Sequence, residues 1–272
     1  MTDKRLSLRE AAALVPAQGA SLAFGGVTLY RRPMAFALAL LERYRTLRAP
    51  KGLTLLSFTS GVESDVLVGE GMIDTTRTCY FGLEVFGLAP HFTQAAGNGT
   101  LRVQEETEAS LANGLRAAMA GVGFLPSLAW IGTDLPRLRP DVRTVVDPYS
   151  GEELIAFPAI QLDVAVIHAL VADPMGNAQI GGNRGVDPEL SMVAETVIVT
   201  AETIVPELTQ TDLLAPTVTA VVHAPQGAWP TSCHPHYPFD GLALLEYTES
   251  VGTAAYAGLI DRWLARHHCG AG

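Results

Sequence analysis

The sequence predicts an α/β fold with a mostly parallel sheet flanked by helices, and two observations support this. Short apolar segments rich in β-branched residues alternate along the chain with longer segments that have helical spacing. The two most apolar segments, Val164–His168 and Thr196–Thr200, enclose a polar loop with several glycines and a short helix. A strand, a glycine-rich loop, a helix and a second strand form the arrangement that places a ligand at the carboxyl ends of parallel strands.

The composition provides enough apolar residues for a large core. The 272 residues are 48% hydrophobic and only 17% charged, which excludes an intrinsically disordered chain. The sequence contains no linker, no low-complexity tract and no internal repeat. Length alone allows one large domain or two small ones, and without a linker we expect a single domain over residues 1–272.

The charge and the cysteine content argue against several classes of function. A net charge of −10 without a basic stripe argues against nucleic-acid binding. Cys79, Cys233 and Cys269 are too few and too widely spaced for a disulfide framework, so we expect a reducing, cytoplasmic location. The N-terminal residues lack the apolar region of a signal peptide, and no run of about 18 apolar residues predicts a membrane span.

The predicted elements begin with a helix over Leu8–Leu14, which Ser7 is placed to cap. A strand at Ser21–Phe24 opens into a double glycine, and a proline then begins a helix over Pro33–Leu47. Thr211–Leu242 contains five prolines and predicts an irregular segment that packs across a partner surface. The other predicted helices are Asp65–Gly69, His91–Ala96, Ala109–Met119 and Ala254–His267. The other predicted strands are Leu53–Phe58, Thr76–Tyr80, Leu101–Glu105, Ala129–Gly132, Val142–Val146 and Val218–Val222.

Residues suited to binding an anion follow the first two predicted strands. Gly25 and Gly26 allow backbone amides to approach a phosphate or a thioester oxygen, beside the start of a helix. A tight turn without a ligand explains the same pair equally well. Ser60 and Gly61 end the second strand, where they either line the same crevice or cap the next element.

The polar loop between the two most apolar strands supplies three more binding candidates, Asn177, Gln179 and Gly182. Small polar residues and glycines at the carboxyl end of a parallel strand are typical of a ligand-binding loop. We therefore predict that these three residues contact substrate.

Carboxylates near strand ends are the candidates for catalysis. Glu105, Glu106 and Glu108 follow a predicted strand and precede a helix, where a carboxylate acts as a nucleophile or general base if its environment tunes it. Helix N-termini also attract acidic residues for structural reasons alone. Glu105 lies nearest the strand end and is our first candidate, and Glu106 is the second. Glu84, in a turn, is a further candidate, although a surface turn explains it more simply.

Histidines and one cysteine provide weaker signals. Cys233, His234 and His236 form a short tract without further ligands at a matching spacing, so we predict a structural loop and no metal site. His168 lies inside an apolar strand, where a hydrogen-bonded core histidine is expected. His267 lies in the C-terminal region, which we expect to fray.

Several well-known motifs are absent from the sequence. It contains no Walker A motif and no Gly-x-Gly-x-x-Gly, which argues against nucleotide- and dinucleotide-binding enzymes. No Gly-x-Ser-x-Gly elbow surrounds the serines that end the second strand, which argues against a serine hydrolase.

An ordered set of motifs resembles the α (A) subunits of the class I coenzyme A transferases, such as those of glutaconate CoA-transferases. In the second half these are DPMGNAQI, GVDPEL and AETVIVTAETIVP, and the late loop GAWPTSCHPHYPFD follows them. In the first half they are SLAFGGVTLYRRPM, GLEVFGLAPHF and VQEETEASLANGLRAAMAGVGFLPS. The resemblance extends over nearly the whole chain.

The resemblance implies an α subunit that moves CoA between an acyl-CoA and a carboxylic acid, in an active site shared with a β subunit. It implies a heterodimer or a higher assembly such as a heterotetramer, with CoA as a substrate and no permanently bound cofactor. In most of this family the catalytic glutamate lies on the β subunit, and no matching motif is found here, since Val68–Met72 resembles a helix end.

Two alternatives stay open at this point. A related branch resembles the sterol ring-opening CoA thioester hydrolases, and there the working glutamate lies on the α chain, in a position that matches Glu105. Glu106 and Thr107 depart from the aromatic residue and serine that many relatives have there. The second alternative is a non-catalytic subunit that binds a metabolite, which the absence of a basic patch makes less favourable.

Overall fold

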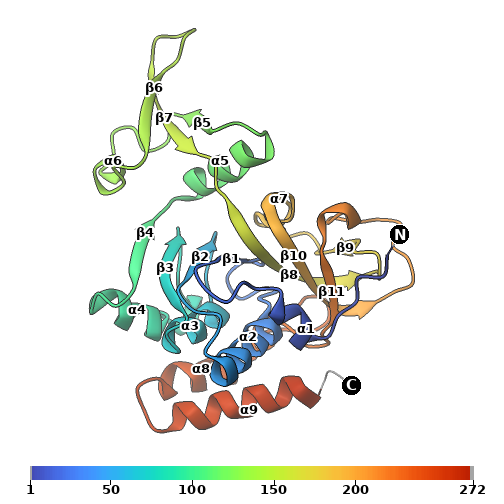
Figure 1. Cartoon of the computed structure of the whole chain (residues 1–272). Helices are drawn as coiled ribbons and strands as arrows, with labels where there is room; N and C mark the ends of the chain where they lie inside the picture. Colours follow the sequence, from blue (N-terminus) through green and yellow to red (C-terminus); the bar gives the residue numbers. More distant parts are fainter. Residues whose placement is uncertain (1, 270–272) are drawn as a thin grey trace.

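The computed structural model describes residues 2–269, which form a large twisted sheet with helices packed against both of its faces (Figure 1). Within these residues the strand order is β11-β10-β8-β1-β2-β3-β4, and all of these neighbours are parallel. The strands of this path are β1 (Ser21–Phe24), β2 (Leu53–Ser57), β3 (Ile73–Thr78), β4 (Arg102–Glu105), β8 (Leu162–Ala172), β10 (Ala194–Ile204) and β11 (Ala220–His223). The short strand β9 (Ala178–Gln179) folds back antiparallel to β8.

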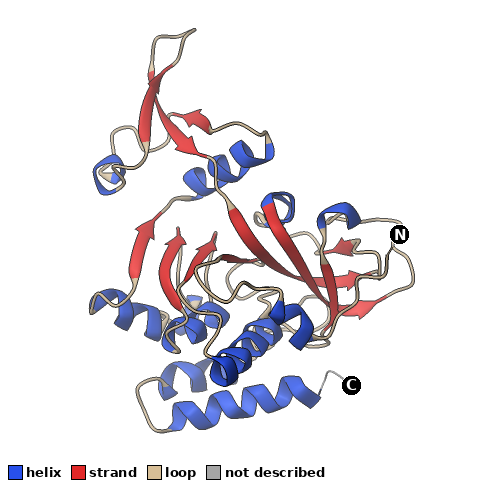
Figure 2. Ribbon diagram, in the orientation of Figure 1, coloured by secondary structure: helices blue, strands red, loops and turns tan. Residues whose placement is uncertain are grey.

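Side chains of the central strands alternate between two hydrophobic layers. Leu22 and Phe24 of β1 face one layer, and Ala23 between them faces the other. The first layer is covered by α1 (Leu8–Ala13), α2 (Met34–Leu47), α3 (Val62–Gly69), α4 (Pro90–Gly97), α8 (Gly241–Ser250) and α9 (Ala255–Cys269). The second layer is covered by α5 (Glu108–Met119) and α7 (Asp187–Val193). The predicted fold class, a mostly parallel sheet flanked by helices, is therefore confirmed (Figure 2).

The order of the strands creates a switch point between β1 and β8. From β1 the chain adds β2, β3 and β4 on one side, and β8, β10 and β11 lie on the other side. Ligands of open α/β sheets bind outside the carboxyl ends of the strands at such a point. In this protein the double glycine follows β1 at that position.

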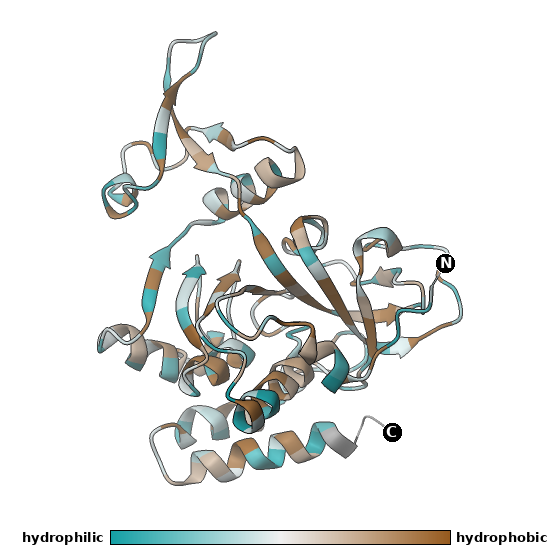
Figure 3. Ribbon diagram, in the orientation of Figure 1, coloured by the Kyte–Doolittle hydropathy of each residue, from teal (hydrophilic) through white to brown (hydrophobic). Residues whose placement is uncertain are grey.

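Strands β8 and β10 are much longer than the sequence predicted. Each has 11 residues, and the central residues of both strands are buried. Figure 3 colours much of these strands as hydrophobic. The predicted strand Val164–His168 stops at a polar residue in an apolar run. His168 instead finds polar partners inside the protein, and the strand continues to Ala172.

A small antiparallel sheet projects beyond the carboxyl ends of β3 and β4 (Figure 1). It consists of β5 (Phe124–Ser127), β6 (Arg143–Val146) and β7 (Glu153–Pro158) in the order β5-β7-β6, with α6 (Leu135–Leu138) beside it. Its core is a separate cluster of Trp130, Val142, Ile155 and Phe157. We refer to residues 124–158 as the lobe. That residues 1–272 form a single domain stays a prediction. Such a domain would have to include the lobe.

The structure corrects three of the predicted elements. Ala129–Gly132 forms turns rather than a strand, because Trp130 there adopts a φ of 76°. Thr76–Tyr80 is displaced, since β3 begins at Ile73 and ends at Thr78. The helix α8 was missed at the end of the segment Thr211–Leu242, which is otherwise irregular apart from η2 (Ala215–Thr217) and β11, as predicted.

The helix caps follow the sequence closely. Ser7 and Glu10 form a capping box at α1, with Ser7 Oγ accepting from the Glu10 amide at 3.3 Å. Asp240 caps the missed helix α8 by accepting a hydrogen bond from the Ala243 amide at 3.0 Å. Among residues 2–269, no helix is both long and apolar enough to cross a membrane.

Candidate active site

The carboxyl ends of β1, β2, β3 and β4 lie along one edge of the sheet and carry most of the predicted site residues. Ser57 pairs with Thr78, and Thr78 pairs with Glu105, so these three residues stand side by side at the ends of β2, β3 and β4. Phe24 of β1 continues this row, since Ala23 pairs with Leu56. Three strand spacings separate Glu105 from Phe24, a distance of about 14 Å. Glu105 and the double glycine therefore share an edge without being neighbours.

Glu105 and Glu106 have opposite environments. Glu106 is only 5% exposed, and its carboxylate accepts hydrogen bonds from Arg77 at 2.7 Å and from Ser110 at 2.6 Å. It also forms an ion pair with Arg139 at 2.8 Å. Glu105 is exposed, and its carboxylate has no hydrogen bond or ion pair with any residue that the structure describes. Glu106 therefore holds the strand end and the lobe together, whereas Glu105 remains available to a substrate or a partner.

The lobe fixes the backbone of this strand end. Arg139 of the lobe donates a hydrogen bond to the Glu105 carbonyl at 2.8 Å, and Trp130 Nε1 donates to the Thr107 hydroxyl at 2.8 Å. Arg139 is almost completely buried, at 5% exposure. The exposed Glu105 side chain thus extends from a rigid backbone.

The double glycine binds an anion, and that anion is the side chain of Asp187. The Gly26 amide donates to both carboxylate oxygens of Asp187, at 3.0 and 3.1 Å. A Cβ atom at Gly25 would lie 2.8 Å from Asp187 Oδ1, so only glycine allows this approach. Arg31 completes the arrangement with an ion pair to Asp187 at 3.0 Å, and both side chains are buried.

This occupancy revises the predicted role of Gly25 and Gly26. The prediction placed a substrate anion on the turn, but in this structure the Gly26 amide is already bound by the Asp187 carboxylate. Burial raises the pKa of Asp187, and the adjacent Arg31 opposes that increase. A ligand would reach this amide only after displacing a buried, paired carboxylate.

Ser60 and Gly61 take part in contacts between the ends of β2 and β3. The Ser60 hydroxyl is hydrogen-bonded to the Ser57 hydroxyl, which also lies 3.2 Å from the Thr78 hydroxyl. The Ser60 amide donates to the Tyr80 carbonyl at 2.9 Å. Gly61 precedes α3, and its amide lies 3.4 Å from the buried carboxylate of Glu63, which is paired with Arg32. Both residues are buried at the site edge, with their polar groups bound within the chain.

Strained backbone marks the same edge. Thr28 has a φ of 47°, Arg31 of 55° and Glu84 of 55°, all in the left-handed region. For a β-branched residue such as Thr28 this conformation is a true outlier, and it is held by a hydrogen bond from its amide to the Thr59 hydroxyl at 2.9 Å. Residues strained in this way concentrate at functional sites. Glu84 is exposed, at the start of η1 (Glu84–Phe86), and its amide donates to the Tyr80 hydroxyl at 3.3 Å.

Asn177 and Gln179 lie in a different part of the molecule from this edge, whereas Gly182 directly precedes Asn183, which contacts Arg31. Val166 is the β8 residue opposite Phe24, and β8 continues for six further residues, about 20 Å, before this loop begins. The Asn177 amide group donates to Asp173 at 2.8 Å, and Gln179 donates to the Gln210 carbonyl at 2.8 Å. The structure therefore does not bring Asn177 and Gln179 together with the double glycine.

Only the second half of the same loop returns to the site. Arg31 donates a hydrogen bond to the Asn183 carbonyl at 2.8 Å, and Asp187 follows four residues later. No side chain or backbone atom lies within 4 Å of the position that a Cβ at Gly182 would take, so this glycine is not required by a close approach. The polar residues and glycines of the loop indicated its importance, but Asp187 was missed, and its signal was the GVDPEL motif itself.

A buried polar cluster on β8 and β10 was also missed as a unit. His168 pairs with Thr200 in the sheet, and Glu202 lies two residues further on the same face. The imidazole of His168 hydrogen-bonds to Thr200 Oγ1 and to Glu202 Oε1, both at 2.8 Å. Burial lowers the pKa of His168, although Glu202 opposes this effect. The expectation of a hydrogen-bonded core histidine is thus confirmed at His168.

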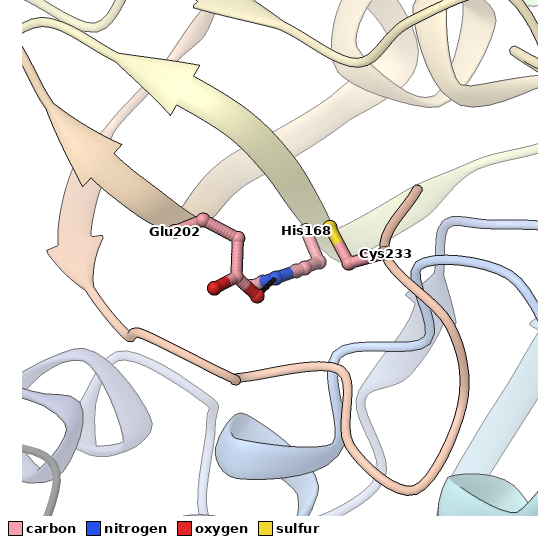
Figure 4. A group of neighbouring side chains, drawn as sticks. All are labelled: His168, Glu202 and Cys233. Atoms are coloured by element: carbon pink, nitrogen blue, oxygen red, sulfur yellow. Dashed lines mark hydrogen bonds and ion pairs between the residues drawn. The ribbon is translucent and has the colours of Figure 1, made fainter. Parts of the chain in front are cut away.

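The cysteine–histidine tract divides into a buried and an exposed part. Cys233 lies beside the His168–Glu202 pair (Figure 4), and burial raises the pKa of its thiol to about 12. His234 and His236 are exposed, so they do not join it. His267 was expected to lie in a frayed end, but its ring is largely enclosed beside Trp229, and burial lowers its pKa to about 4.

Comparisons with known proteins agree with this geometry. Residues 5–222 match the family model described as "Coenzyme A transferase". The chain is 32% identical over 242 residues to the A subunit of 3-oxoadipate CoA-transferase from Pseudomonas knackmussii, covering 86% of this chain and 84% of the relative. It is also 32% identical over 277 residues to the cholesterol ring-cleaving hydrolase IpdA subunit of Rhodococcus jostii, covering 92% and 88% of the two chains.

Solved structures show the same architecture. A variant of the decarboxylase AibA/AibB superposes with a TM-score of 0.90 at 32% identity, covering 98% of this chain and 100% of the other. Glutaconate coenzyme A-transferase from Acidaminococcus fermentans superposes with a TM-score of 0.87 at 27% identity, covering 97% and 90% of the two chains. The relatives of this chain thus include transferases, a hydrolase and a decarboxylase, at 27–32% identity.

Proposed function

Because this chain belongs to the coenzyme A transferase family, we propose that it is the α subunit of a two-subunit enzyme that moves CoA between an acyl-CoA and a carboxylic acid. The match of the family model over residues 5–222 carries this proposal, together with the relatives named as A subunits of CoA-transferases. CoA is a substrate in this proposal, and the transfer reaction uses no permanently bound cofactor. A cytoplasmic location is part of the same proposal.

The exposed edge of the sheet supports a site completed by a second chain. Glu105 is a carboxylate without a partner among the described residues, at the end of an edge strand that has no neighbour beyond it. Apolar side chains are also exposed on the segment between β3 and β4, with Val85 at 85% and Leu88 at 72% exposure. An exposed strand edge and exposed apolar groups are typical of a surface that a partner covers. The proposed partner is a β subunit, in a heterodimer or a heterotetramer.

The proposed transfer proceeds through covalent catalysis by a glutamate of the β subunit. Its carboxylate attacks the thioester carbonyl, which releases CoA as the thiolate and leaves a mixed anhydride. The thiolate then attacks the glutamyl carbonyl, which releases the first carboxylic acid and leaves a glutamyl-CoA thioester. The acceptor carboxylate reverses these two steps and leaves as the new acyl-CoA. In this scheme Glu105 forms no covalent bond, and it has a structural role or acts through neighbouring residues.

Hydrolysis is the second candidate, because Glu105 is exposed where a general base would be needed. A carboxylate that activates water, or removes a proton from carbon during ring opening, must reach the substrate. Glu105 meets that requirement and Glu106 does not, since its oxygens are bound by Arg77, Arg139 and Ser110. The similarity to the IpdA subunit gives this candidate its specific support.

The deciding experiment is an assay of the chain reconstituted with its β subunit, with acyl-CoA and either acetate or water as acceptor. The proposal expects acetate-dependent exchange that Glu105→Gln largely preserves, and hydroxylamine trapping of a glutamate on the β chain. Glu108→Gln is the matched control, an exposed glutamate in the same segment.

Release of CoA without an acceptor, reduced about 10²–10⁴-fold by Glu105→Gln but not by Glu108→Gln, would establish the hydrolase instead. Robust exchange by the purified α chain alone would contradict the proposed sharing of the site. Binding of acyl-CoA without turnover by the reconstituted pair would favour a metabolite-binding subunit.

A further inference from the structure

Three buried side chains with different donor atoms meet where β8, β10 and the segment after β11 come together. His168 lies on β8, Glu202 on β10, and Cys233 in the segment that covers both strands (Figure 4). One imidazole nitrogen, one carboxylate oxygen and the thiol sulfur all lie within 4.8 Å of one another. None of these three side chains takes part in the transfer proposed above.

Nitrogen, oxygen and sulfur donors in one group match the preferences of a borderline-soft divalent ion. Zinc binds Cys, His and carboxylate ligands, and sites with three protein ligands leave a fourth position open. His168 and Cys233 are completely buried, and Glu202 is 8% exposed. The exposed His234 and His236, which drew attention in the sequence, are not members of this set.

The surroundings orient each potential ligand. Thr200 Oγ1 lies 2.8 Å from Nδ1 of His168, which directs Nε2 toward Glu202. The Gln226 amide donates to Glu202 Oε2 at 2.7 Å, and the Tyr237 hydroxyl donates to Oε1. Metal-binding histidines and carboxylates usually have such outer hydrogen bonds, and these can all persist when an ion is bound.

The charges of the group also suit a divalent ion. The Glu202 carboxylate and a Cys233 thiolate together supply two negative charges. Arg31 lies close, with its guanidinium donating to the His168 carbonyl at 2.7 Å, but its charge is already paired with Asp187 at 3.0 Å. The surrounding segment therefore adds little uncompensated positive charge to oppose a cation.

A surface pocket of about 540 Å³ lies beside residues that contact the group. Its lining includes Gln226 and Tyr237, the two residues that donate hydrogen bonds to Glu202. Gln226 and Tyr237 therefore connect the buried group to this surface pocket.

We infer that His168, Glu202 and Cys233 bind one zinc ion that fastens the segment after β11 to the sheet. To admit the ion, the 2.8 Å between His168 Nε2 and Glu202 Oε1 must widen by about half an ångström, given the usual zinc–ligand distances. The thiol proton of Cys233 passes to solvent, and the proton of His168 moves from Nε2 to Nδ1, so that the imidazole stays neutral.

The inferred ion would stabilise the wall of the candidate active site. The segment that carries Cys233 pairs with the loop after the double glycine, where the Arg31 amide donates to the Ser232 carbonyl at 2.7 Å. The Ala35 amide donates to the Gly227 carbonyl at 2.8 Å. Fastening this segment to β8 and β10 therefore holds the strained loop around Thr28 and Arg31.

The test measures the metal content and the cobalt spectrum of the full chain. Protein produced with zinc in the medium should retain about one zinc ion per chain after extensive dialysis. Replacement by cobalt should give a thiolate-to-cobalt charge-transfer band in the near ultraviolet. Cys233→Ser should abolish that band and lower the zinc content to background, and Thr200→Val should weaken zinc binding about 10–100-fold.

Two matched variants separate this site from adventitious binding. Cys79→Ser removes a cysteine that follows β3, and His236→Gln removes an exposed histidine of the same segment as Cys233. Both variants should keep the zinc and the band. Wild-type protein that holds no zinc after dialysis and shows no charge-transfer band overturns the inference, whether or not the variants fold. Zinc that is retained equally by Cys233→Ser also overturns it, because the ion then lies elsewhere.

Discussion

The ends of β1 and β4 differ in whether their polar groups are already bound. At β1 the Gly26 amide, Asp187 and Arg31 satisfy one another in a buried arrangement. At β4 the Glu105 carboxylate extends into solvent without a partner among the described residues, although the backbone beneath it is fixed by Arg139. Both regions follow a strand and precede a helix, so their sequence patterns are similar. The difference teaches that a strand end with polar residues becomes a site only where the chain leaves those residues unbound.

The largest expected effect comes from opening the closed region. Asp187→Ala leaves the Arg31 guanidinium buried without its partner, which should lower the free energy of unfolding by about 3–5 kcal/mol. The control is Asp261→Ala, since Asp261 forms an exposed ion pair with Arg45 and should cost less than about 1 kcal/mol. Chemical denaturation measures both variants.

Added acetate sharpens this result. In the Asp187→Ala protein the Gly26 amide and Arg31 face an empty carboxylate position, so acetate should recover part of the lost stability through binding to the native state. Acetate should leave Asp261→Ala unchanged. A small loss of stability in Asp187→Ala, with no recovery in acetate, would contradict this difference. It would mean that the polar groups at the end of β1 are not held by a buried ion pair.

The second effect compares the two adjacent glutamates of β4. Glu106→Gln removes the charge that faces Arg77 and Arg139, and we expect a loss of about 3 kcal/mol, because one buried partner of an ion pair is then missing. Glu105→Gln changes an exposed side chain and should stay within about 0.5 kcal/mol of wild type. Thermal unfolding of the two variants under the same conditions provides the measurement. Equal losses of stability in the two variants would show that the Glu105 side chain also has bonding partners in solution. The end of β4 would then be as closed as the end of β1.

The third effect concerns pH and a carboxylate away from both strand ends. Asp65 is buried, and burial raises its pKa to about 6, against hydrogen bonds from the Phe92 amide and Tyr247. Between the unfolded pKa of 3.8 and the folded pKa of about 6, the native state binds the proton more tightly. The contribution of Asp65 to stability therefore increases as the pH falls from 7 to 4, by about 2–3 kcal/mol at most.

Asp65→Asn provides the comparison for this pH dependence. The variant cannot titrate at this position, so the difference in unfolding free energy between wild type and variant should change in favour of the wild type as the pH falls. A difference that is constant from pH 7 to pH 4 would mean that Asp65 has an ordinary pKa.

The sequence was sufficient to predict those features that depend on neighbouring residues. The strand Ser21–Phe24 was predicted with its correct bounds, and the cap at Ser7 was predicted because its partner lies three residues away. The predicted end of β8 was wrong because the buried polar ring of His168 is hydrogen-bonded to Glu202, 34 residues later in the chain. No local pattern could reveal that partner.

The site was harder to predict than the fold for the same reason. Asp187 reaches Gly26 across 161 positions of the chain, so the anion bound by the double glycine could not be read from the residues around it. Glu105 and Glu106 have the same local chemistry, and only Arg77 and Arg139, from another strand and from the lobe, distinguish them. The sequence could predict which residues lie at a strand end. It could not predict whether their polar groups are already bound, because that depends on contacts between distant segments.

The smallest expected effect tests whether the strain in the closed region serves a purpose. Thr28 has a φ of 47°, which is costly for a β-branched residue, and glycine adopts this conformation freely. Thr28→Gly should therefore increase the free energy of unfolding by about 1 kcal/mol. The relief of strain is partly offset by the greater freedom of glycine in the unfolded chain.

If the strained loop positions substrate, the same variant should lower the activity of the reconstituted enzyme even though the chain is more stable. Stability is measured by denaturation and activity by the CoA-exchange assay. The control is Thr253→Gly, which removes an exposed hydroxyl that accepts from the Ala255 amide at the start of α9, and it should lower stability and leave activity unchanged. A variant that gains stability and keeps full activity would show that the strain belongs to the closed packing of Gly26, Arg31 and Asp187 alone, and that catalysis depends on the exposed end of β4.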